Sequence, residues 1–148
     1  MSLKNSFDLS VFDIHELASA NMAGNAGIDI SLSQNCWFRL RAIYFEITTD
    51  ATAVNRWPRI LYSRTGFGDF AIAFPDAAIT ASKAVRGCFA LGLLDLQTST
   101  QQMVSAPLPD IILLGNELIT FEIQNGVAGD VVANIRTRWD VWQQGYNL

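Results

Sequence analysis

The clearest pattern in the chain is a two-residue alternation of apolar and polar positions between Gly129 and Trp142. The odd positions carry Val, Ala, Ile, Thr, Trp and Val, whereas the even ones are mostly Asn, Arg, Arg and Asp. Such alternation is typical of a β-strand with one face in the core and the other in water or on a partner. At about 3.3 Å per residue the strand would be about 40 Å long, so it needs equally long neighbours.

Shorter alternating or apolar segments, separated by turn residues, supply those neighbours. They predict strands over residues 28–32, 36–49, 57–63, 70–74, 88–96, 111–114 and 117–124. The Asn125-Gly126 dipeptide, a strong hairpin signal, separates the last of these from the long C-terminal strand. Residues 75–85 are rich in Ala and predict a short helix or an irregular loop. With about eight strands and no repeated helical pattern, the chain is expected to be all-β, an antiparallel β-sandwich or jelly roll.

Two segments carry local irregularities. Between Cys36 and Thr49 the apolar positions change from even to odd numbers, which indicates either a β-bulge or a strand buried on both faces. A bulge is favoured, because the bend would let this one strand take part in both sheets of a sandwich. Pro107-Leu108-Pro109 predicts a rigid, extended lead-in to the apolar residues 111–114.

The first 27 residues differ from the rest and predict an N-terminal arm and linker (1–27) ahead of a sandwich domain (28–148). Ser10 and Asp13 have the spacing of a helix capping box. The apolar residues around them fall on one helical face: Val11, Ile14, Leu17 and Ala18. A short helix here would either pack on its own domain or, tethered by the flexible linker 21–27, dock on a neighbouring subunit. The anchors of a docked arm would be Phe7, Leu9 and Phe12.

Composition narrows the class of protein. The chain has 148 residues, of which half are hydrophobic and 16% are charged, so one domain with a sizeable core is expected. Its 10 basic and 14 acidic residues give a net charge of −4, which argues against a nucleic-acid-binding surface. No apolar run is long enough for a membrane span, and the N-terminal residues lack the apolar core of a secretion signal. Without such a signal, Cys36 and Cys88 are expected to be reduced, buried thiols rather than a disulfide.

The sequence offers little material for catalysis or cofactor binding. His15 is the only histidine and has no Cys nearby, so neither a zinc site nor a Ser–His–Asp triad is expected. A glycosidase-like acid and base would have to come from carboxylates that mostly fall in turns or on polar strand faces: Asp69, Asp76, Asp95, Asp110, Glu117, Glu122, Asp130 and Asp140. Gly66 and Gly68 do not lie between a strand and a helix, so a phosphate cradle is not expected. We therefore expect no enzyme activity, no metal and no cofactor.

Tryptophan and arginine residues on the outward phase of two strands are the best candidates for binding. Trp37 is out of phase with the apolar positions that follow it, as is Trp142 with Trp139. Outward rings of this kind anchor either a sugar or another subunit. The arginines share the outward phase, a pattern that suits an interface but also a solvated face. The interface hypothesis comprises Phe7, Leu9, Phe12, Trp37, Arg39, Arg41, Arg136, Arg138 and Trp142.

Several of these segments, taken in order, resemble a known family. They are the strand from Trp37 to Thr49, the following Val54-Asn55-Arg56, the Leu108-Pro109 pair, and Gly129-Asp130 leading into the last strand, which ends near Trp139. Together they are similar to small virion proteins encoded in the structural gene clusters of tailed bacteriophages. The similarity in pattern covers residues 36–142 and brings no catalytic residues with it.

That resemblance implies a β-sandwich that serves as a building block of the virion, assembled in the host cytoplasm. The implied role is a non-enzymatic capsid decoration or auxiliary head protein. It would form homo-oligomers, commonly trimers, and bind the major capsid protein or other virion proteins. The alternative is a component of the head–tail junction, tail or fibre that binds a surface glycan as a carbohydrate-binding module. Neither role implies contact with nucleic acid or with a membrane.

Overall fold

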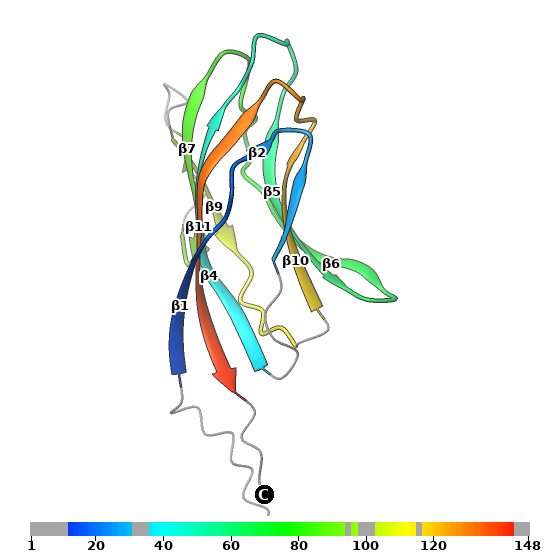
Figure 1. The fold of residues 1–148 in the computed structure, drawn as a ribbon, viewed down its shortest axis with the longest axis vertical. Coiled ribbons are helices and arrows are strands. Elements are labelled where there is room, and N and C mark those ends of the chain that lie inside the picture. The colour runs from blue at the N-terminus through cyan, green and yellow to red at the C-terminus, as the bar shows by residue number, and fades with distance from the viewer. Residues whose placement is uncertain (1–11, 31–35, 94–95, 98–102, 115–116, 144–148) are drawn as a thin grey trace, which may run out of the picture.

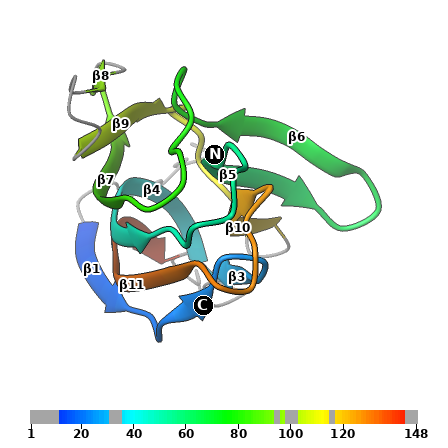
Figure 2. The ribbon, with the colours of Figure 1, turned by 90° about the horizontal axis from the view of Figure 1, so that it is seen from above.

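The computed structural model of the protein describes residues 12–30, 36–93, 96–97, 103–114 and 117–143. Every regular element in these ranges is a β-strand. The strands, labelled in Figures 1 and 2, are β1 (Phe12–Ala18), β2 (Met22–Ala23), β3 (Gly27–Ile30), β4 (Cys36–Thr48), β5 (Trp57–Arg64), β6 (Gly68–Ala73), β7 (Ala84–Leu91), β8 (Leu96–Gln97), β9 (Met103–Leu108), β10 (Glu117–Gln124) and β11 (Val131–Gln143).

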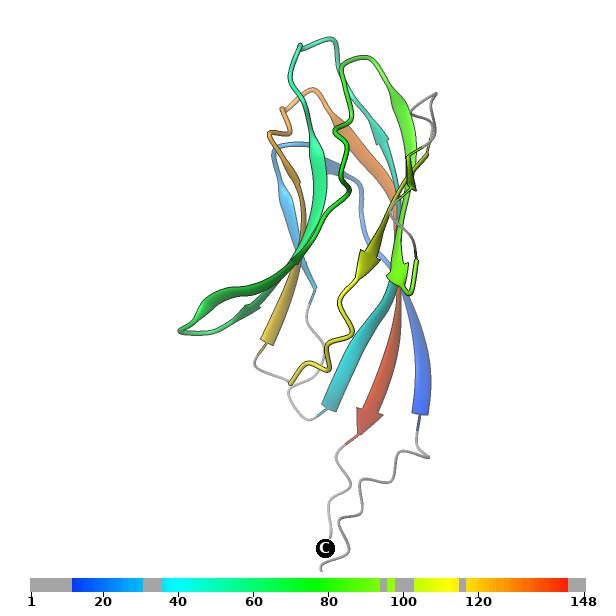
Figure 3. The same cartoon turned by 180° about the vertical axis from the view of Figure 1, so that it is seen from behind.

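These strands form two sheets that lie face to face as two layers, as Figures 2 and 3 show. The larger sheet has seven strands in the order β1-β11-β4-β7-β9-β8, with β2 also paired to β11. The smaller sheet has four, in the order β3-β10-β5-β6. All pairs are antiparallel except β7 and β9, which are parallel. The predicted all-β sandwich is confirmed, whereas the jelly-roll alternative stays a prediction.

The core fills the space between the two layers. The largest apolar side chains in it are fully buried: Trp139, Tyr62, Phe38, Phe89 and Phe121. Phe45 of β4 links the layers, because its ring centroid lies 5.3 Å from that of Phe89 in the same sheet and 4.8 Å from that of Phe121 in the other. Gly87 makes room for this ring, since a Cβ at that position would lie 2.0 Å from it. Aromatic packing therefore sets how the two sheets sit on each other.

The predicted bulge is present in β4. In its pairing with β11, Arg138 lies opposite Ala42 but Trp139 lies opposite Leu40, which leaves Arg41 as the extra residue. The buried positions change from even to odd numbers here, as the sequence indicated. The expectation that the bend takes β4 into both sheets is wrong, because its ladder partners β11 and β7 both belong to the larger sheet.

β11 has a second irregularity, which the sequence pattern concealed. Asn134 has a positive φ of 53° and, together with Ile135, lies opposite the single residue Phe45. Asparagine adopts this left-handed conformation more readily than most residues, so it suits a bulge. Before the bulge the phase is reversed: Val132 is buried and Val131 is 47% exposed. The predicted alternation is therefore wrong at the start of β11 and correct in its middle.

The predicted N-terminal helix is also wrong. Residues 12–18 form β1, which pairs antiparallel with β11 from Phe12 opposite Trp142 to Ala18 opposite Arg136. Without β1, the long strand β11 would present an unpaired edge. A ladder of 7 residues outweighs a local helix preference, which is worth only about 0.5 kcal/mol or less per residue.

This pairing changes the predicted division of the chain. β2 also pairs with β11, so residues 12–23 contribute strands to the sandwich instead of forming an arm. Residues 1–11, which include the predicted anchors Phe7 and Leu9, lie outside the described residues. An arm confined to those eleven positions stays a prediction.

Most other predicted strands are present with shifted ends. β5, β6 and β10 match their predicted segments closely, whereas β7 begins at Ala84, before the predicted start at residue 88. Residues 75–83 form the irregular loop that was one of the two alternatives, joined to Arg56 by an isolated bridge at Ile79. β9 was not predicted as a strand, and its residues Pro107 and Leu108 were expected only to form an extended lead-in. Proline fits there because β8 pairs with β9 only as far as Ser105.

Candidate interaction surfaces

The predicted tryptophans and arginines of β4 and β11 lie on the outer face of the larger sheet, and the register brings part of the set together. Trp37 lies opposite Trp142, and Arg39 lies opposite Asp140. Arg41 is the bulged residue next to this pair. Phe12 is opposite Trp142 in the backbone register of β1. We call the group formed by Trp37, Arg39, Arg41, Asp110, Asp140 and Trp142 the Arg–Trp cluster.

Two more predicted arginines lie further along the same face. Arg138 is opposite Ala42 and Arg136 is opposite Tyr44, and both arginines are exposed. Together with Arg86 of β7, five of the 10 basic residues in the chain therefore lie on the outer face of the larger sheet. Carboxylates share this face, because Asp140 and Asp110 bind Arg39 and Glu46 forms a 3.5 Å ion pair with Arg86, so the face carries charges of both signs.

Asp140 holds the arginines of the Arg–Trp cluster in place. Its side chain is fully buried, and its Oδ2 accepts hydrogen bonds from Nε (3.0 Å) and Nη2 (2.7 Å) of Arg39. Arg39 Nη1 donates to Asp110 Oδ1 at 2.9 Å, while Arg41 Nε forms a longer ion pair of 3.6 Å with Asp140 Oδ1. The hydrogen bond with Asp140, the largest cause, raises the pKa of Arg39 despite its partial burial. The arginine is thus fixed in place and permanently charged.

Arg39 also covers part of the aromatic surface. Its guanidinium carbon lies 5.5 Å from the ring centroid of Trp142, within the range of a cation–π interaction. One face of the Trp142 ring is therefore occupied by the chain's own arginine. Arg41 has 47% of its side chain exposed, so it is the cationic group of the cluster most accessible to a partner.

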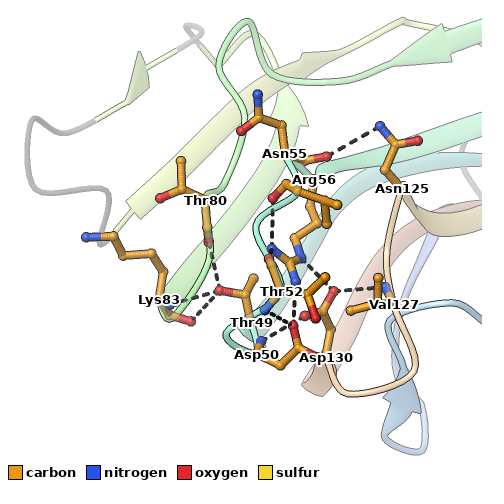
Figure 4. A network of polar contacts seen from close by, with 11 residues as sticks. Thr49, Asp50, Thr52, Asn55, Arg56, Thr80, Lys83, Asn125, Val127 and Asp130 are labelled. Atoms are coloured by element: carbon orange, nitrogen blue, oxygen red, sulfur yellow. Dashed lines mark hydrogen bonds and ion pairs between the residues drawn. The ribbon is translucent and has the colours of Figure 1, made fainter.

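A second arginine–aspartate network lies beyond the opposite end of β11 (Figure 4). Arg56 is fully buried; its Nε donates to Asp130 Oδ2 at 2.7 Å and its Nη2 to Asp50 Oδ1 at 2.7 Å. Its Nη1 donates to the carbonyl oxygens of Thr52 and Val54. The network thus ties the loop after β4 to the turn before β11.

Asp130 completes that network. It accepts hydrogen bonds from the backbone amides of Asp50 (2.9 Å) and Val127 (3.0 Å) in addition to Arg56. Burial by itself would raise the pKa of Asp130, but the hydrogen bond from Arg56, those from the two amides and the charge of Arg56 outweigh it and hold the pKa below its ordinary value. Because each of these groups has its partner inside the protein, we infer that the network is a structural lock, which holds the loop after β4 against the turn before β11.

The buried carboxylates correct one sequence expectation. Asp130, Asp140 and Glu117 were assigned to turns or solvated strand faces, but all three are buried. Each has an arginine as its partner; for Glu117 it is Arg64, whose Nε donates to it at 2.7 Å. In the described part of the chain, no three or more His, Cys, Asp or Glu residues are grouped so that they could hold a metal ion. Sequence alone missed these pairs because their members are far apart in the chain.

A third surface lies on the smaller sheet. The hairpin of β5 and β6 projects away from the rest of the sandwich in all three ribbon views (Figures 1, 2 and 3). It carries large exposed apolar side chains: Phe67 (83% exposed), Phe70 (48%), Ile72 (46%) and Phe74 (48%). The sequence predicted only an ordinary strand over residues 70–74. The missed signal is the uncharged run Phe70-Ala71-Ile72-Ala73-Phe74 in a strand that ends its sheet.

Cys88 is a free thiol, half-buried in β7, and this burial raises its pKa. That agrees with the predicted reduced state for this residue. Among the described residues, no helix is long and apolar enough to cross a membrane.

Comparison of the chain with known protein families, with curated proteins and with solved structures gives no significant match.

Proposed function

We propose that the chain is a non-enzymatic structural protein of a tailed-bacteriophage virion, a capsid decoration or auxiliary head protein that stabilises the shell through subunit contacts. The observation that carries the proposal is the outer face of the larger sheet, where Arg39 is held by Asp140 and lies over the Trp142 ring, next to Arg41. Arg138 and Arg136 lie further along β11 on the same face. Arginine and tryptophan are the residues that most often dominate the binding energy of protein interfaces.

The geometry of the cluster supports binding to a protein surface. Arg39 is held by Asp140 and Asp110 before any partner arrives, so it loses little conformational freedom on binding. Apart from Asp110, the cluster lies on the adjacent strands β4 and β11 rather than on a loop, which keeps its groups at fixed spacing. The half-exposed guanidinium of Arg41 favours a partner that presents a carboxylate beside the cluster.

The sequence resemblance supplies the identity of the partners. They are neighbouring copies of the chain, commonly in trimers, and the major capsid protein. The N-terminal latch remains part of the proposal for residues 1–11 only. Its test must spare residues 12–23, because these form strands of the sandwich. Deleting residues 1–11 is expected to lower incorporation into particles without changing the thermal unfolding temperature of the domain.

Copy counting tests the proposed role. Quantitative mass spectrometry on purified particles gives the ratio of this chain to the major shell protein. Copies in step with the shell protein support decoration of the capsid lattice. A small fixed number would instead favour the head–tail junction, tail or fibre. Absence of the chain from particles would overturn the virion proposal.

A carbohydrate-binding module is the second candidate, favoured by the cross-strand pair of Trp37 and Trp142. Aromatic side chains at directly paired positions of two strands suit stacking on sugar rings. Since Arg39 occupies one face of Trp142, only the remaining ring surface could take part. Trp37→Ala would then abolish retention on host glycans while leaving particle incorporation unchanged. Loss of incorporation with no glycan retention in the wild-type protein would favour the decoration role.

A further inference from the structure

β6 ends the smaller sheet and has one unpaired edge. It pairs with β5 through Ile72 opposite Leu61 and Ala73 opposite Ile60, and the sheet order stops there. Within the described residues, no hydrogen bond reaches the other edge of β6. An unpaired strand edge is a row of free backbone donors and acceptors, which a second strand can complete.

Only the centre of this edge lacks the features that normally protect such strands, because Asp69 and a bulge at Phe70 lie on one side of it and Pro75 lies beyond Phe74 on the other. Natural edges carry charged side chains, prolines or bulges that block pairing. The segment from Phe70 to Phe74 contains neither charge nor proline. Phe70 is the extra residue of a β-bulge, because Ala71 lies opposite Tyr62 and Asp69 opposite Ser63. Ala71, Ile72 and Ala73 then pair regularly with β5, and Phe74 lies just beyond the end of β6. An uncharged edge of this kind is expected to be covered in the working protein.

The sequence of this segment fits a second copy of itself. Phe70-Ala71-Ile72-Ala73-Phe74 reads the same in both directions. In an antiparallel pair centred on Ile72, each Phe70 lies opposite a Phe74, each alanine opposite an alanine, and the two Ile72 residues opposite each other. Burial follows the same alternation, because Phe70, Ile72 and Phe74 are about half exposed whereas Ala73 is buried. Within the regularly paired part of β6, the two Ile72 side chains would meet on the outer face and the alanines on the core side.

The exposed apolar area is sufficient for a modest interface. With about 200 Å² for each aromatic side chain, the exposed parts of Phe67, Phe70, Ile72 and Phe74 sum to about 400 Å² per copy. Two copies would cover about 800 Å², and the backbone and flanking residues bring the total toward the lower limit of about 1,200 Å² for specific interfaces. The contact should therefore form reversibly and depend on concentration.

We propose that β6 is a self-association strand: two copies of the chain pair antiparallel through their β6 edges about a two-fold axis at Ile72. The two smaller sheets then join into one continuous sheet that spans both subunits. This inference shares with the proposed function only the idea that the chain assembles with itself. It is tested on purified protein, so its failure is distinguishable from absence of the chain in particles.

The first experiment measures the dimer dissociation constant by sedimentation equilibrium of the purified full chain, across a wide range of concentration. Wild type is expected to dimerise. Ile72→Lys places two like charges opposite each other at the two-fold axis and is expected to weaken the dimer at least about tenfold. Ile112→Lys is the matched control, because Ile112 is also 46% exposed but lies outside β6. The control should stay within about twofold of wild type.

The second experiment tests the register and does not depend on the stability of a lysine variant. With both native cysteines replaced by serine, Ile72→Cys should form an intersubunit disulfide under mild oxidation, because directly paired strand residues have the Cα spacing that a disulfide needs. Ile112→Cys should not. The proposal is overturned by a wild-type chain that stays monomeric at all concentrations, as it would if β6 instead captured a strand of another protein. It is also overturned by a dimer that Ile72→Lys leaves intact, or by equal crosslinking at both positions.

Discussion

Asp130, just before β11, and Asp140, near the other end of that strand, are both fully buried and both bound by an arginine, but their surroundings differ. Asp130 has both oxygens satisfied by Arg56 and by backbone amides of the loops that it joins. Asp140 Oδ1 has no hydrogen bond among the described residues, and the arginines facing Asp140 remain partly exposed. A closed network of this kind contributes to folding. A network with an unsatisfied carboxylate oxygen and partly exposed arginines leaves charge available to a partner. The network around Asp130 therefore serves stability, whereas the one around Asp140 is suited to binding.

Arg56→Met should have the largest effect on stability. It leaves Asp130 buried without its cationic partner, and removing one member of a buried pair typically costs about 3–5 kcal/mol. The free energy of unfolding in urea measures this loss. Arg86→Met is the matched control, because the Arg86 side chain is 79% exposed and should lose less than about 0.5 kcal/mol. Similar losses in both variants would contradict the assignment of Arg56 to a structural lock.

Asp140→Asn should destabilise the domain less, by about 1–2 kcal/mol, because Arg39 and Arg41 can turn toward solvent when the carboxylate charge is removed. Urea unfolding again gives the value. Asp110→Asn serves as its control: Asp110 also binds Arg39, but its side chain is 69% exposed, so the change should stay under about 0.5 kcal/mol. If Asp140→Asn cost as much as Arg56→Met, the networks around Asp140 and Asp130 would contribute equally to stability, and the proposed difference between them would be wrong.

Acid should weaken the network around Asp130, because this carboxylate loses its charge as the pH falls. The pKa of Asp130 in the folded protein lies below its ordinary value of 3.8, so its charged form stabilises the fold at higher pH. This contribution is present above about pH 4 and is lost as the pH falls toward the folded pKa. Unfolding free energies of wild type and Asp130→Asn, measured between about pH 6 and pH 3, should converge as the pH falls. Parallel curves would show that Asp130 does not carry the effect.

The strand pattern could be read from the sequence because burial alternates locally. The bulge at Arg41 was visible as a change of phase within β4, because the polarity of each residue in this strand indicates which face of the sheet it lies on. The bulge at Asn134 was not, because Val131, Val132 and Ala133 are all apolar and fit either phase. β1 was misread as a helix for a similar reason: a short apolar segment matches both periods, and only its pairing with β11 decides.

The candidate sites depended on contacts between distant segments, which a single sequence does not reveal. Asp140 had the sequence position of a solvated residue, yet Arg39, 101 residues away, covers it. Likewise, Asn55-Arg56 and Gly129-Asp130 stood out as separate features, but Arg56 and Asp130 form one ion pair. The outward phase of Arg39, Arg41 and Trp142 was readable from alternation. Their arrangement around a buried carboxylate was not.

Substitutions of the exposed arginines in and beside the Arg–Trp cluster should affect stability least. Any loss of binding that they cause is therefore easy to separate from a loss of folding. Arg41→Ala removes a half-exposed side chain held by one long ion pair, so the free energy of unfolding should change by less than about 0.5 kcal/mol. If the cluster binds neighbouring subunits, the same variant should nonetheless lower the number of copies per particle, and Arg41→Ala/Arg138→Ala should lower it further. Arg86→Ala, also exposed on this sheet but distant from Asp140, should leave the copy number unchanged. Full incorporation of the double variant would mean that the Arg–Trp cluster is a solvated surface. Subunit contacts would then have to lie elsewhere, and β6 is the next candidate.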